Sequence, residues 1–523
     1  MQRRSPRLSG WAAVIGCTAV IGCVLGAAAG CSESDGGAVA LGAAGSGGGV
    51  GGEMGGSPAS AGGTGAMPPG AGLGEGVGGA QGAVVGAAGA DQAPPGPSSL
   101  GDAGLEVAAD AGQGRLDAGA VSTLDPELAL RLTGLSSRLS VLAARTSSFW
   151  FEHGPDVVFG GFHGTLDRQG NPVAPDDKGL IQQARHLWML STWCERRGAA
   201  AELVLLAEQT YSFFKSSFVD ADGGFVFKVS RDGTRVVDAK KQMFAESYAI
   251  YALSTYGRVF HDAEATALAL DRFASIDASR HDALNGGYDQ RADPGFLTAG
   301  AEKDTNTHLH LMEAFSALFE ATHDPRVGTR LNELVDLFAT RLRQPSGYVH
   351  AEFKLDWALF GAPRVSYGHD LETAWLLLDA ARVLGRGADE VPRSAALAIA
   401  ESSAGPGFDA LAGGFFEAGA VGGLADDFDK IWWVQFEAME GLWWSYELSG
   451  DSLYLDRLGR TLDWVESTED LPVGEWFATT NPDGSAAGSD YKSDEWKASY
   501  HTVRALVFLQ DWIDDELAGR SAP

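Results

Sequence analysis

The chain has 523 residues and a formal net charge of −30, with 39 Lys and Arg against 69 Asp and Glu. Nucleic-acid partners select basic faces, so this charge argues against them, whereas it suits a protein that handles a neutral small molecule. Three of the four cysteines lie within the first 31 residues, which leaves Cys194 alone in the rest of the chain. That part can therefore form neither an internal disulfide nor a thiolate metal cage.

The first 31 residues have the features of an export signal. Three arginines among the first seven residues precede an apolar run, Trp11–Leu25, that is too short for a membrane span. A small-residue run before Cys31 resembles a bacterial lipoprotein cleavage site, and Cys23 is a competing match. We expect an exported protein, lipid-anchored through Cys31 to a bacterial membrane in the periplasm or at the cell surface. A plain secretory signal is the alternative.

Residues 32–122 are mostly Gly, Ala, Ser and Pro. Such a composition cannot bury enough apolar surface to offset the entropy of ordering the chain. We expect a flexible tether with a reach on the order of 50 Å.

A turn pairing glycine or glutamate with an aromatic residue recurs six times, at a spacing of about 60–67 residues. The six turns are Gly160-Gly161-Phe162, Gly223-Gly224-Phe225, Gly286-Gly287-Tyr288, Gly347-Tyr348, Gly413-Gly414-Phe415 and Glu475-Trp476-Phe477. So regular a period indicates stacked or ring-closed structural repeats.

Between successive turns lie pairs of stretches with apolar residues at helical spacing. Examples are Gln242–Tyr256, Ala263–Ile276, Asn306–Thr322, Arg326–Leu342, Leu371–Leu384, Ala395–Ser402, Trp432–Leu448 and Tyr454–Val465. Leu128–Thr146 at the start and Lys497–Leu517 at the end have the same pattern. About twelve helices predict an all-α fold over residues 123–520. Specifically, we expect an (α/α)6 barrel of six helical hairpins with short β-turn excursions, and we expect it to be monomeric. An open helical solenoid is the alternative, but it should carry atypical capping repeats.

Two histidines lie in polar–aromatic helical segments, and imidazole exchanges protons near neutral pH. His369 and Glu372 share one helix face, so the carboxylate could orient the imidazole and raise its basicity. Alternatively, Glu372 only complements the helix dipole. His501 shares a face with Lys497 and Arg504, cations that would keep it neutral. Alternatively, His501 is a satisfied core residue.

Two further positions stand out on helices. His308 and His310 point about 200° apart on a helix, so they do not form a metal pair. Glu313 lies one turn beyond His310, which favours His310 for the cavity and a structural role for His308. Arg185 lies within an apolar helix and could stabilise a developing oxyanion, or else form an ion pair inside the barrel.

Tryptophans offer flat apolar surfaces to sugar rings. Adjacent Trp432 and Trp433 should not both point inward, so we expect one of them, with Trp496, to line the pocket. Ordinary core packing is the alternative for each.

Several segments in order resemble the N-acylglucosamine 2-epimerase superfamily, and most closely its cellobiose 2-epimerase branch. The resemblance runs from Phe149 to Leu509 through Phe149-Trp150, Gly160–Gly164, Lys178–Trp188, Phe244–Leu253, Asn306–Glu313, Ser366–Trp375, Trp432–Gln435 and Trp496–Arg504. Phe244 stands where family members often carry tyrosine.

The resemblance implies an (α/α)6 barrel that interconverts glucose-type and mannose-type sugars at C2 without a redox cofactor or metal. By motif, His369 and His501 would be the acid/base pair, and Glu372 would support His369. His310 would assist substrate binding and ring opening. Arg185 would stabilise the enediolate, and Trp432 and Trp496 would hold the sugar rings.

Three other functions stay open on the sequence. Proton delivery to C1 instead of C2 would make the protein an aldose–ketose isomerase. A glycoside hydrolase would need two carboxylates across the scissile bond, and the segments around Asp289 and Asp356 show no persuasive pair. A non-catalytic surface carbohydrate-binding protein would keep the tryptophans but could lose a histidine.

Overall fold

The computed structural model describes residues 124–520, except 222, 291, 294–301 and 489–490. The predicted signal, the acylated Cys31 and the tether lie outside the described residues, so those predictions are untested. Within the described ranges, no helix combines the length and the apolar character that crossing a membrane requires.

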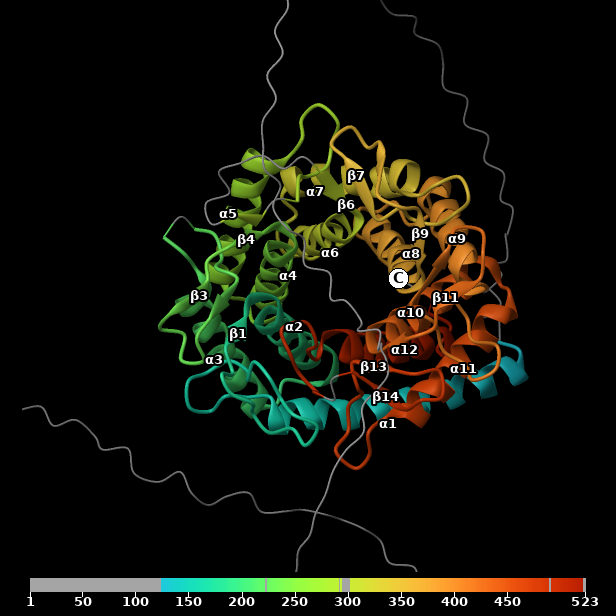
Figure 1. Ribbon diagram of the computed structural model, residues 1–523, viewed down its shortest axis with the longest axis horizontal. Helices are drawn as coiled ribbons and strands as arrows, with labels where there is room; N and C mark the ends of the chain where they lie inside the picture. The colour runs from blue at the N-terminus through green and yellow to red at the C-terminus, as the bar shows by residue number, and fades with distance from the viewer. Residues whose placement is uncertain (1–123, 222, 291, 294–301, 489–490, 521–523) are drawn as a thin grey trace, which may run out of the picture. The chain divides into compact units, whose positions relative to one another are not determined.

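Twelve α-helices in the described part alternate between an inner and an outer ring (Figure 1). The inner helices are α2 (Leu180–Arg197), α4 (Met243–Val259), α6 (Thr305–Thr322), α8 (Tyr367–Val383), α10 (Trp432–Ser449) and α12 (Tyr500–Leu517). The outer helices are α1 (Pro126–His153), α3 (Ala201–Phe218), α5 (Ala263–Arg280), α7 (Pro325–Leu337) with a short π-helix η1 (Phe338–Leu342), α9 (Glu390–Ala404) and α11 (Ser452–Thr468).

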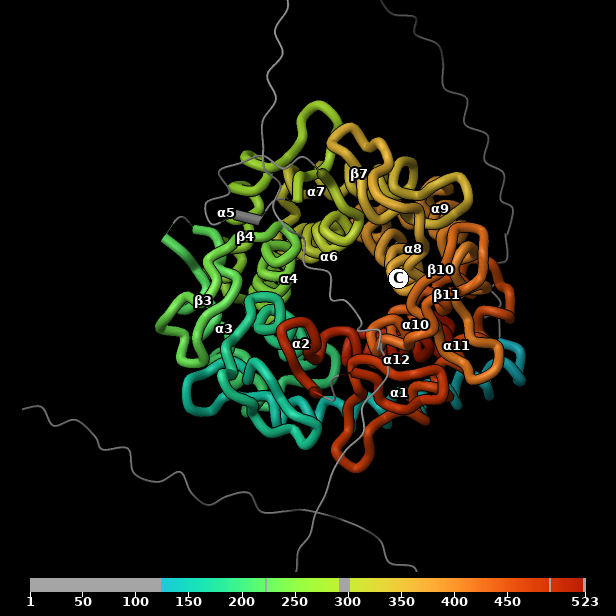
Figure 2. Tube along the Cα trace, in the orientation of Figure 1, coloured from blue at the N-terminus to red at the C-terminus, as the bar shows by residue number. Residues whose placement is uncertain are grey.

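Each inner helix contacts the next, and α12 returns to contact α2 (Figure 2). The first helix, α1, packs against the last, α12, and completes the sixth hairpin. The (α/α)6 barrel is thereby confirmed, and the open solenoid is excluded.

The apolar pattern of each helix explains its ring. The inner helix α4 is buried without interruption from Met243 to Gly257. The outer helix α7 buries only one face, through Val327, Leu331, Leu334, Val335 and Leu337. A helix with a single apolar stripe suits the solvent side of a barrel, whereas a helix buried all round belongs inside.

The predicted β-turn excursions are small antiparallel sheets. A strand leads directly into each inner helix from α2 to α10, namely β1 (Lys178–Gly179), β4 (Lys241–Gln242), β6 (Glu302–Asp304), β9 (Arg364–Ser366) and β12 (Lys430–Ile431). Each pairs with a strand of the following repeat: β2 (Lys228–Val229), β5 (Ala292–Asp293), β7 (Glu352–Lys354), β10 (Ala418–Ala420) and β13 (Thr479–Thr480). Four sheets gain a third strand, from β3 (Val236–Asp238), β8 (Leu359–Phe360), β11 (Ala425–Asp427) and β14 (Ala486–Ala487). The sheets thus tie neighbouring repeats together at the N-terminal ends of the inner helices.

Side chains of the inner helices and lead-in strands hold the repeated turns. Lys430 Nζ donates to Asp409 at 2.7 Å and to the Gly413 carbonyl at 2.7 Å, and Gln435 Oε1 accepts from the Phe415 N–H at 2.7 Å. In the third repeat, His308 takes the corresponding place, because its Nε2 accepts from the Tyr288 N–H at 2.9 Å. The structural interpretation of His308 is confirmed.

Candidate active site

A pocket of about 200 Å³ opens among the first two turns of the inner helices and the segment before α12. Ten residues line it: Arg185, Phe244, Asn306, His310, His369, Glu372, Trp432, Trp433, Trp496 and His501. All seven of the predicted site residues in the barrel are therefore brought together. Asn306 was not predicted as a site residue.

The two predicted acid/base histidines come from different helices and meet in this pocket. His369 lies in the first turn of α8 and His501 in the first turn of α12. The Trp433 ring contacts both, with centroid distances of 4.7 Å to His369 and 5.9 Å to His501. The arrangement places two proton-transfer groups around one small space.

Both imidazoles are held neutral. Burial, with a contribution from His310, lowers the pKa of His369 to about 4. Burial lowers the pKa of His501 well below its usual range, and the positive charges of Arg185 and Arg504 lower it further. Each histidine can therefore act as a base at neutral pH.

The hydrogen-bond partners of the histidines differ from the prediction. His369 Nδ1 hydrogen-bonds to Ser366 Oγ at 2.9 Å, and no hydrogen bond joins His369 to Glu372 in the described structure. His501 instead has the carboxylate partner, since its Nδ1 lies 2.5 Å from Glu437 Oε1. Such a bond fixes the tautomer and stabilises the imidazolium. The predicted support of His369 by Glu372 is wrong, and Glu437 was missed.

Glu372 lies deeper in the barrel, where Arg504 attracts it. Arg504 Nη2 donates to Glu372 Oε1 at 3.3 Å and to Glu437 Oε1 at 2.5 Å, while Nη1 donates to Glu313 Oε1 at 2.5 Å. Burial and the neighbouring Glu437 carboxylate raise the pKa of Glu372 well above its usual range. Glu372 is therefore bound to Arg504 at the edge of the pocket and is not a hydrogen-bond partner of His369.

Lys497 does not act on His501 as predicted. Its Nζ donates to Glu475 Oε1 at 2.8 Å and to the Lys492 carbonyl at 3.1 Å. Lys497 precedes the first turn of α12, so helical spacing does not apply to it. Of the two predicted cations, only Arg504 belongs to the surroundings of the histidine.

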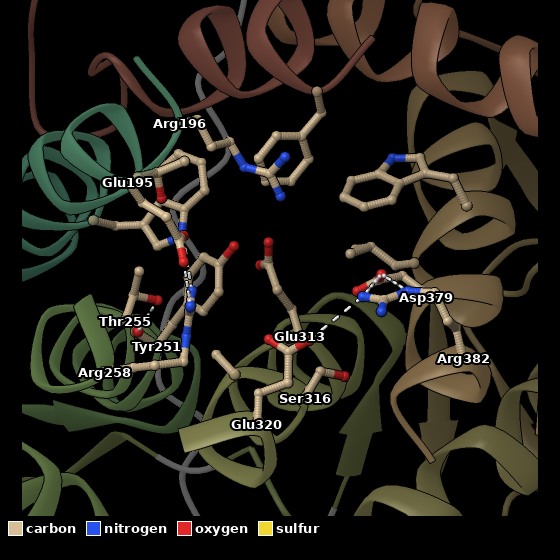
Figure 3. Close-up of a pocket in the computed structure, with 16 residues that line it drawn as sticks. Glu195, Arg196, Tyr251, Thr255, Arg258, Glu313, Ser316, Glu320, Asp379 and Arg382 are labelled. Atoms are coloured by element: carbon tan, nitrogen blue, oxygen red, sulfur yellow. Dashed lines mark hydrogen bonds and ion pairs between the residues drawn. The ribbon is translucent and has the colours of Figure 1, made fainter. Parts of the chain in front are cut away.

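His310 has the predicted partner in Glu313. Its Nδ1 lies 3.1 Å from Glu313 Oε2, and its Nε2 lies 3.3 Å from the Tyr248 hydroxyl. Glu313 also reaches a second cavity, of about 90 Å³, where it points toward the centre beside Tyr251 (Figure 3). The arginines of that cavity carry carboxylate partners, as in the Arg258–Glu195 pair. Glu313 thus contacts His310 and also lines the second cavity.

Arg185 presents its charge to the pocket. Nη2 donates to the Tyr248 hydroxyl at 2.7 Å, and Nη1 donates to the Trp496 carbonyl. Among the described residues it has no carboxylate partner, so the alternative of an internal ion pair is wrong. A guanidinium without a carboxylate partner at the wall of the pocket is suited to a developing negative charge.

Both neighbouring tryptophans line the pocket, so the prediction that only one does is wrong. Trp432 and Trp433 begin α10, and adjacent helical residues point about 100° apart. A pocket beside a helix would receive only one of two adjacent side chains. This pocket lies at the end of α10, so both Trp432 and Trp433 can line it. Trp496 lies at the mouth with 47% of its surface exposed.

Two groups of buried side chains have the spacing of metal ligands. They are Asp156, His163 and Asp176, and Glu372, Glu437 and His501. Protein cations already bind the carboxylates of each group, Arg231 in the first and Arg504 in the second. Both groups are therefore ion-paired within the protein.

The chain belongs to the N-acylglucosamine 2-epimerase family, whose model matches residues 160–505. It is 32% identical over 384 residues to a cellobiose 2-epimerase of Bacteroides fragilis, a match that covers 70% of this chain and 96% of that protein. It is 27% identical to the N-acylglucosamine 2-epimerase of Bos taurus, with 72% and 91% of the chains covered. The structure of cellobiose 2-epimerase from Spirochaeta thermophila superposes with a TM-score of 0.69 at 31% identity, covering 75% of this chain and all of that one.

Proposed function

We propose that the protein is a sugar 2-epimerase that interconverts glucose-type and mannose-type reducing ends of a cellobiose-like disaccharide, without a redox cofactor or metal. The observation that carries the proposal is the pair of neutral histidines around one pocket, with the Trp433 ring in contact with both. Inversion at a carbon next to an aldehyde needs one base and one acid on opposite faces of that carbon.

The pocket residues divide the steps among them. After ring opening, assisted by His310, one histidine removes the C2 proton and the other returns a proton to the opposite face. One proton leaves and one arrives, so the sugar changes only its configuration. Between the two transfers the cis-enediolate carries one negative charge, which the Arg185 guanidinium stabilises. Trp432 and Trp496 supply flat apolar surfaces for sugar rings.

His501 is the better candidate for the group that carries the extra proton during the reaction. Its Nδ1 bonds to the Glu437 carboxylate at 2.5 Å, whereas His369 has only the neutral Ser366 hydroxyl. A carboxylate stabilises the imidazolium more than a hydroxyl does. Removal of the C2 proton is therefore more favourable when His501 is the base than when His369 is the base.

Incubation of the protein with cellobiose in D2O tests the proposal. A 2-epimerase yields the mannose-type epimer with deuterium at C2. A ketose product would identify the aldose–ketose isomerase on the same scaffold. Binding of the sugar without any deuterium exchange would identify a carbohydrate-binding protein instead.

We also propose that the protein is exported and lipid-anchored through Cys31, with the barrel as a monomer at the end of its tether. The basic start, the apolar run and the small residues before Cys31 support this. Cys31→Ser should move the protein from the membrane fraction to the soluble fraction, and Cys23→Ser should not. Retention of the Cys31→Ser protein in the membrane fraction, or release by Cys23→Ser, would overturn the assignment.

A further inference from the structure

The sixth repeated turn differs from the others at one position. Glu475 adopts left-handed backbone with φ of 64°. The first, third and fifth turns have glycine at this place, with φ of 68°, 72° and 74° at Gly161, Gly287 and Gly414. Left-handed backbone costs free energy for a residue that carries a Cβ, and such strain gathers at functional sites. Glu475 therefore bears a cost that glycine would avoid.

The inner helix of the sixth repeat also differs. In the fifth turn, Gln435, the fourth residue of α10, holds the turn so closely that a Cβ on Gly414 would lie 2.7 Å from its Oε1. The fourth residues of α2 and α6 exclude a Cβ in the first and third turns in the same way, and they are Gln183 and His308. The fourth residue of α12 is Val503, which has no polar side-chain atom to hold the turn. In the sixth repeat the turn itself supplies the polar side chain, through Glu475.

The carboxylate of Glu475 binds the segment that leads into α12. Its Oε1 accepts from Lys497 Nζ at 2.8 Å, and its Oε2 accepts from the Trp150 indole N–H at 3.0 Å. The backbone carbonyl of Glu475 accepts from Lys492 Nζ at 3.0 Å. Glu475 and both lysines are fully buried. One residue thus holds the segment 492–497 at both of its ends.

This segment supports two groups of the catalytic pocket. Trp496 lines the pocket, and the N–H groups of Trp496 and Lys497 both donate to Asp494 Oδ1, at 2.8 and 2.7 Å. The Trp496 carbonyl accepts from Arg185 Nη1. The position of the segment 492–497 therefore helps to set where the Trp496 ring lies and where the Arg185 guanidinium points.

The pair of Lys497 and Glu475 is better suited to fixing a geometry than to adding stability. Removing two charges from water can cost more free energy than their attraction regains, so a buried ion pair adds little stability. Both side chains of this pair are fully buried, and Glu475 also stands in strained backbone. Both features cost stability, and both restrict the chain to one arrangement.

We propose that Glu475 is a positioning residue of the epimerase site. Through Lys492 and Lys497 it holds the segment 492–497 so that Trp496 contacts the sugar and Arg185 contacts the enediolate. The inference rests on the proposed function and adds to it a residue outside the pocket lining that acts through two pocket residues.

The test replaces both members of the ion pair. The paired variant, Glu475→Gln with Lys497→Met, removes both charges and keeps similar sizes, so its melting temperature should stay close to that of the wild type. We expect kcat with cellobiose to fall by about 10- to 100-fold, because a displacement of about 1 Å can cost 10²-fold, and KM to rise. Glu246→Gln with Arg272→Met is the matched control, since it neutralises another buried pair, which links α4 to α5 at 2.7 Å. Its kcat and KM should equal those of the wild type.

A double-mutant cycle with Arg185→Gln tests whether the loss passes through Arg185. In that background the paired variant should lower kcat by less than about 2-fold, because the group that Glu475 positions is already absent. A loss as large as in the wild-type background would overturn the proposal. Wild-type kcat and KM in the paired variant would overturn it as well. If the paired variant does not fold, Glu475→Gln alone carries the same comparison.

Amide hydrogen exchange separates this inference from the proposed function. The amides of Trp496 and Lys497 should exchange faster in the paired variant than in the wild type, because the segment 492–497 opens more readily. If the wild type epimerises no sugar, the proposed function fails, while faster exchange still supports the role of Glu475 in holding the segment. Exchange at the wild-type rate would show that Glu475 does not hold it.

Discussion

Glu437→Gln is the substitution that most directly probes the catalytic pocket. Glu437 accepts from His501 through Oε1 and from the Trp375 indole through Oε2 at 3.1 Å. Glutamine keeps the size and one acceptor oxygen but removes the charge that stabilises the imidazolium. A hydrogen bond to a charged group contributes about 1.5–3 kcal/mol, which corresponds to about one to two pKa units.

The direction in which the pH–rate profile shifts depends on whether the Glu437 carboxylate favours the protonated or the neutral form of His501. Glu437 stabilises protonated His501, so its neutralisation lowers the pKa of His501 further below its usual range. The acidic limb of the kcat/KM profile should therefore move to lower pH. His501 also becomes a weaker base, so the plateau should fall by about 10- to 100-fold, a part of the roughly 10²–10⁴-fold contribution of general-base catalysis.

The matched control lies one helical turn away. Glu440 is also fully buried and lies 3.8 Å from Arg504 Nε, and no contact joins it to His501 in the described structure. Burial and Glu437 raise the pKa of Glu440 well above its usual range. Because Glu440 does not contact His501, Glu440→Gln should leave both the rate and the acidic limb unchanged. The pairing of Glu437 with His501 would be refuted if Glu437→Gln kept the acidic limb of the wild-type kcat/KM profile. An equal loss of kcat/KM in Glu440→Gln would refute it as well. Melting temperatures of both variants establish that each is folded.

Three further substitutions test the site and the fold. His501→Asn should abolish deuterium exchange at C2 while calorimetry still detects sugar binding, and exchange at the wild-type rate would remove His501 from the mechanism. Arg185→Gln should lower kcat by about 10²–10³-fold, the usual cost of losing an oxyanion donor, and an unchanged kcat would leave the enediolate without this partner. Lys430→Met should lower the free energy of unfolding by about 3–5 kcal/mol, because it leaves Asp409 uncompensated in the interior. The exposed pair of Lys215 and Glu264 provides the comparison, with Lys215→Met expected to cost about 0–1 kcal/mol in denaturant titrations.

The fold could be predicted because its determinants are local. Five of the six repeated turns place glycine in left-handed backbone, as at Gly160 and Gly161 with φ of 86° and 68°, a conformation that glycine adopts without strain. Glu475 adopts the same conformation, with φ of 64°, at the corresponding place in the sixth turn. Helical periodicity between the turns then defined two helices per repeat. Turn chemistry and periodicity are both visible within a few residues of sequence.

The carboxylate partner of His501 and the contact between Glu372 and Arg504 could not be predicted, because these residues are distant in sequence. Glu437 lies 64 residues before His501, and Glu372 lies 132 residues before Arg504. Spacing along one helix suggested Glu372 as the partner of His369 but carried no information on what the facing helix offers. One signal was present, since Glu437 and Glu440 stand in the apolar segment of α10, where a carboxylate is rarely buried without a partner.

The carboxyl groups around Arg504 explain how the barrel interior tolerates its charges. Four of them, from Glu313, Glu372, Glu437 and Glu440, surround one guanidinium. Four buried negative charges against one positive charge would be prohibitively costly, and burial with the neighbouring Glu437 accordingly raises the pKa of Glu372 and Glu440 well above the usual range. The other two carboxyl groups each bond to a histidine, Glu313 to His310 and Glu437 to His501. Arg504 thus balances buried carboxyl groups and holds Glu313 and Glu437 where each meets a histidine.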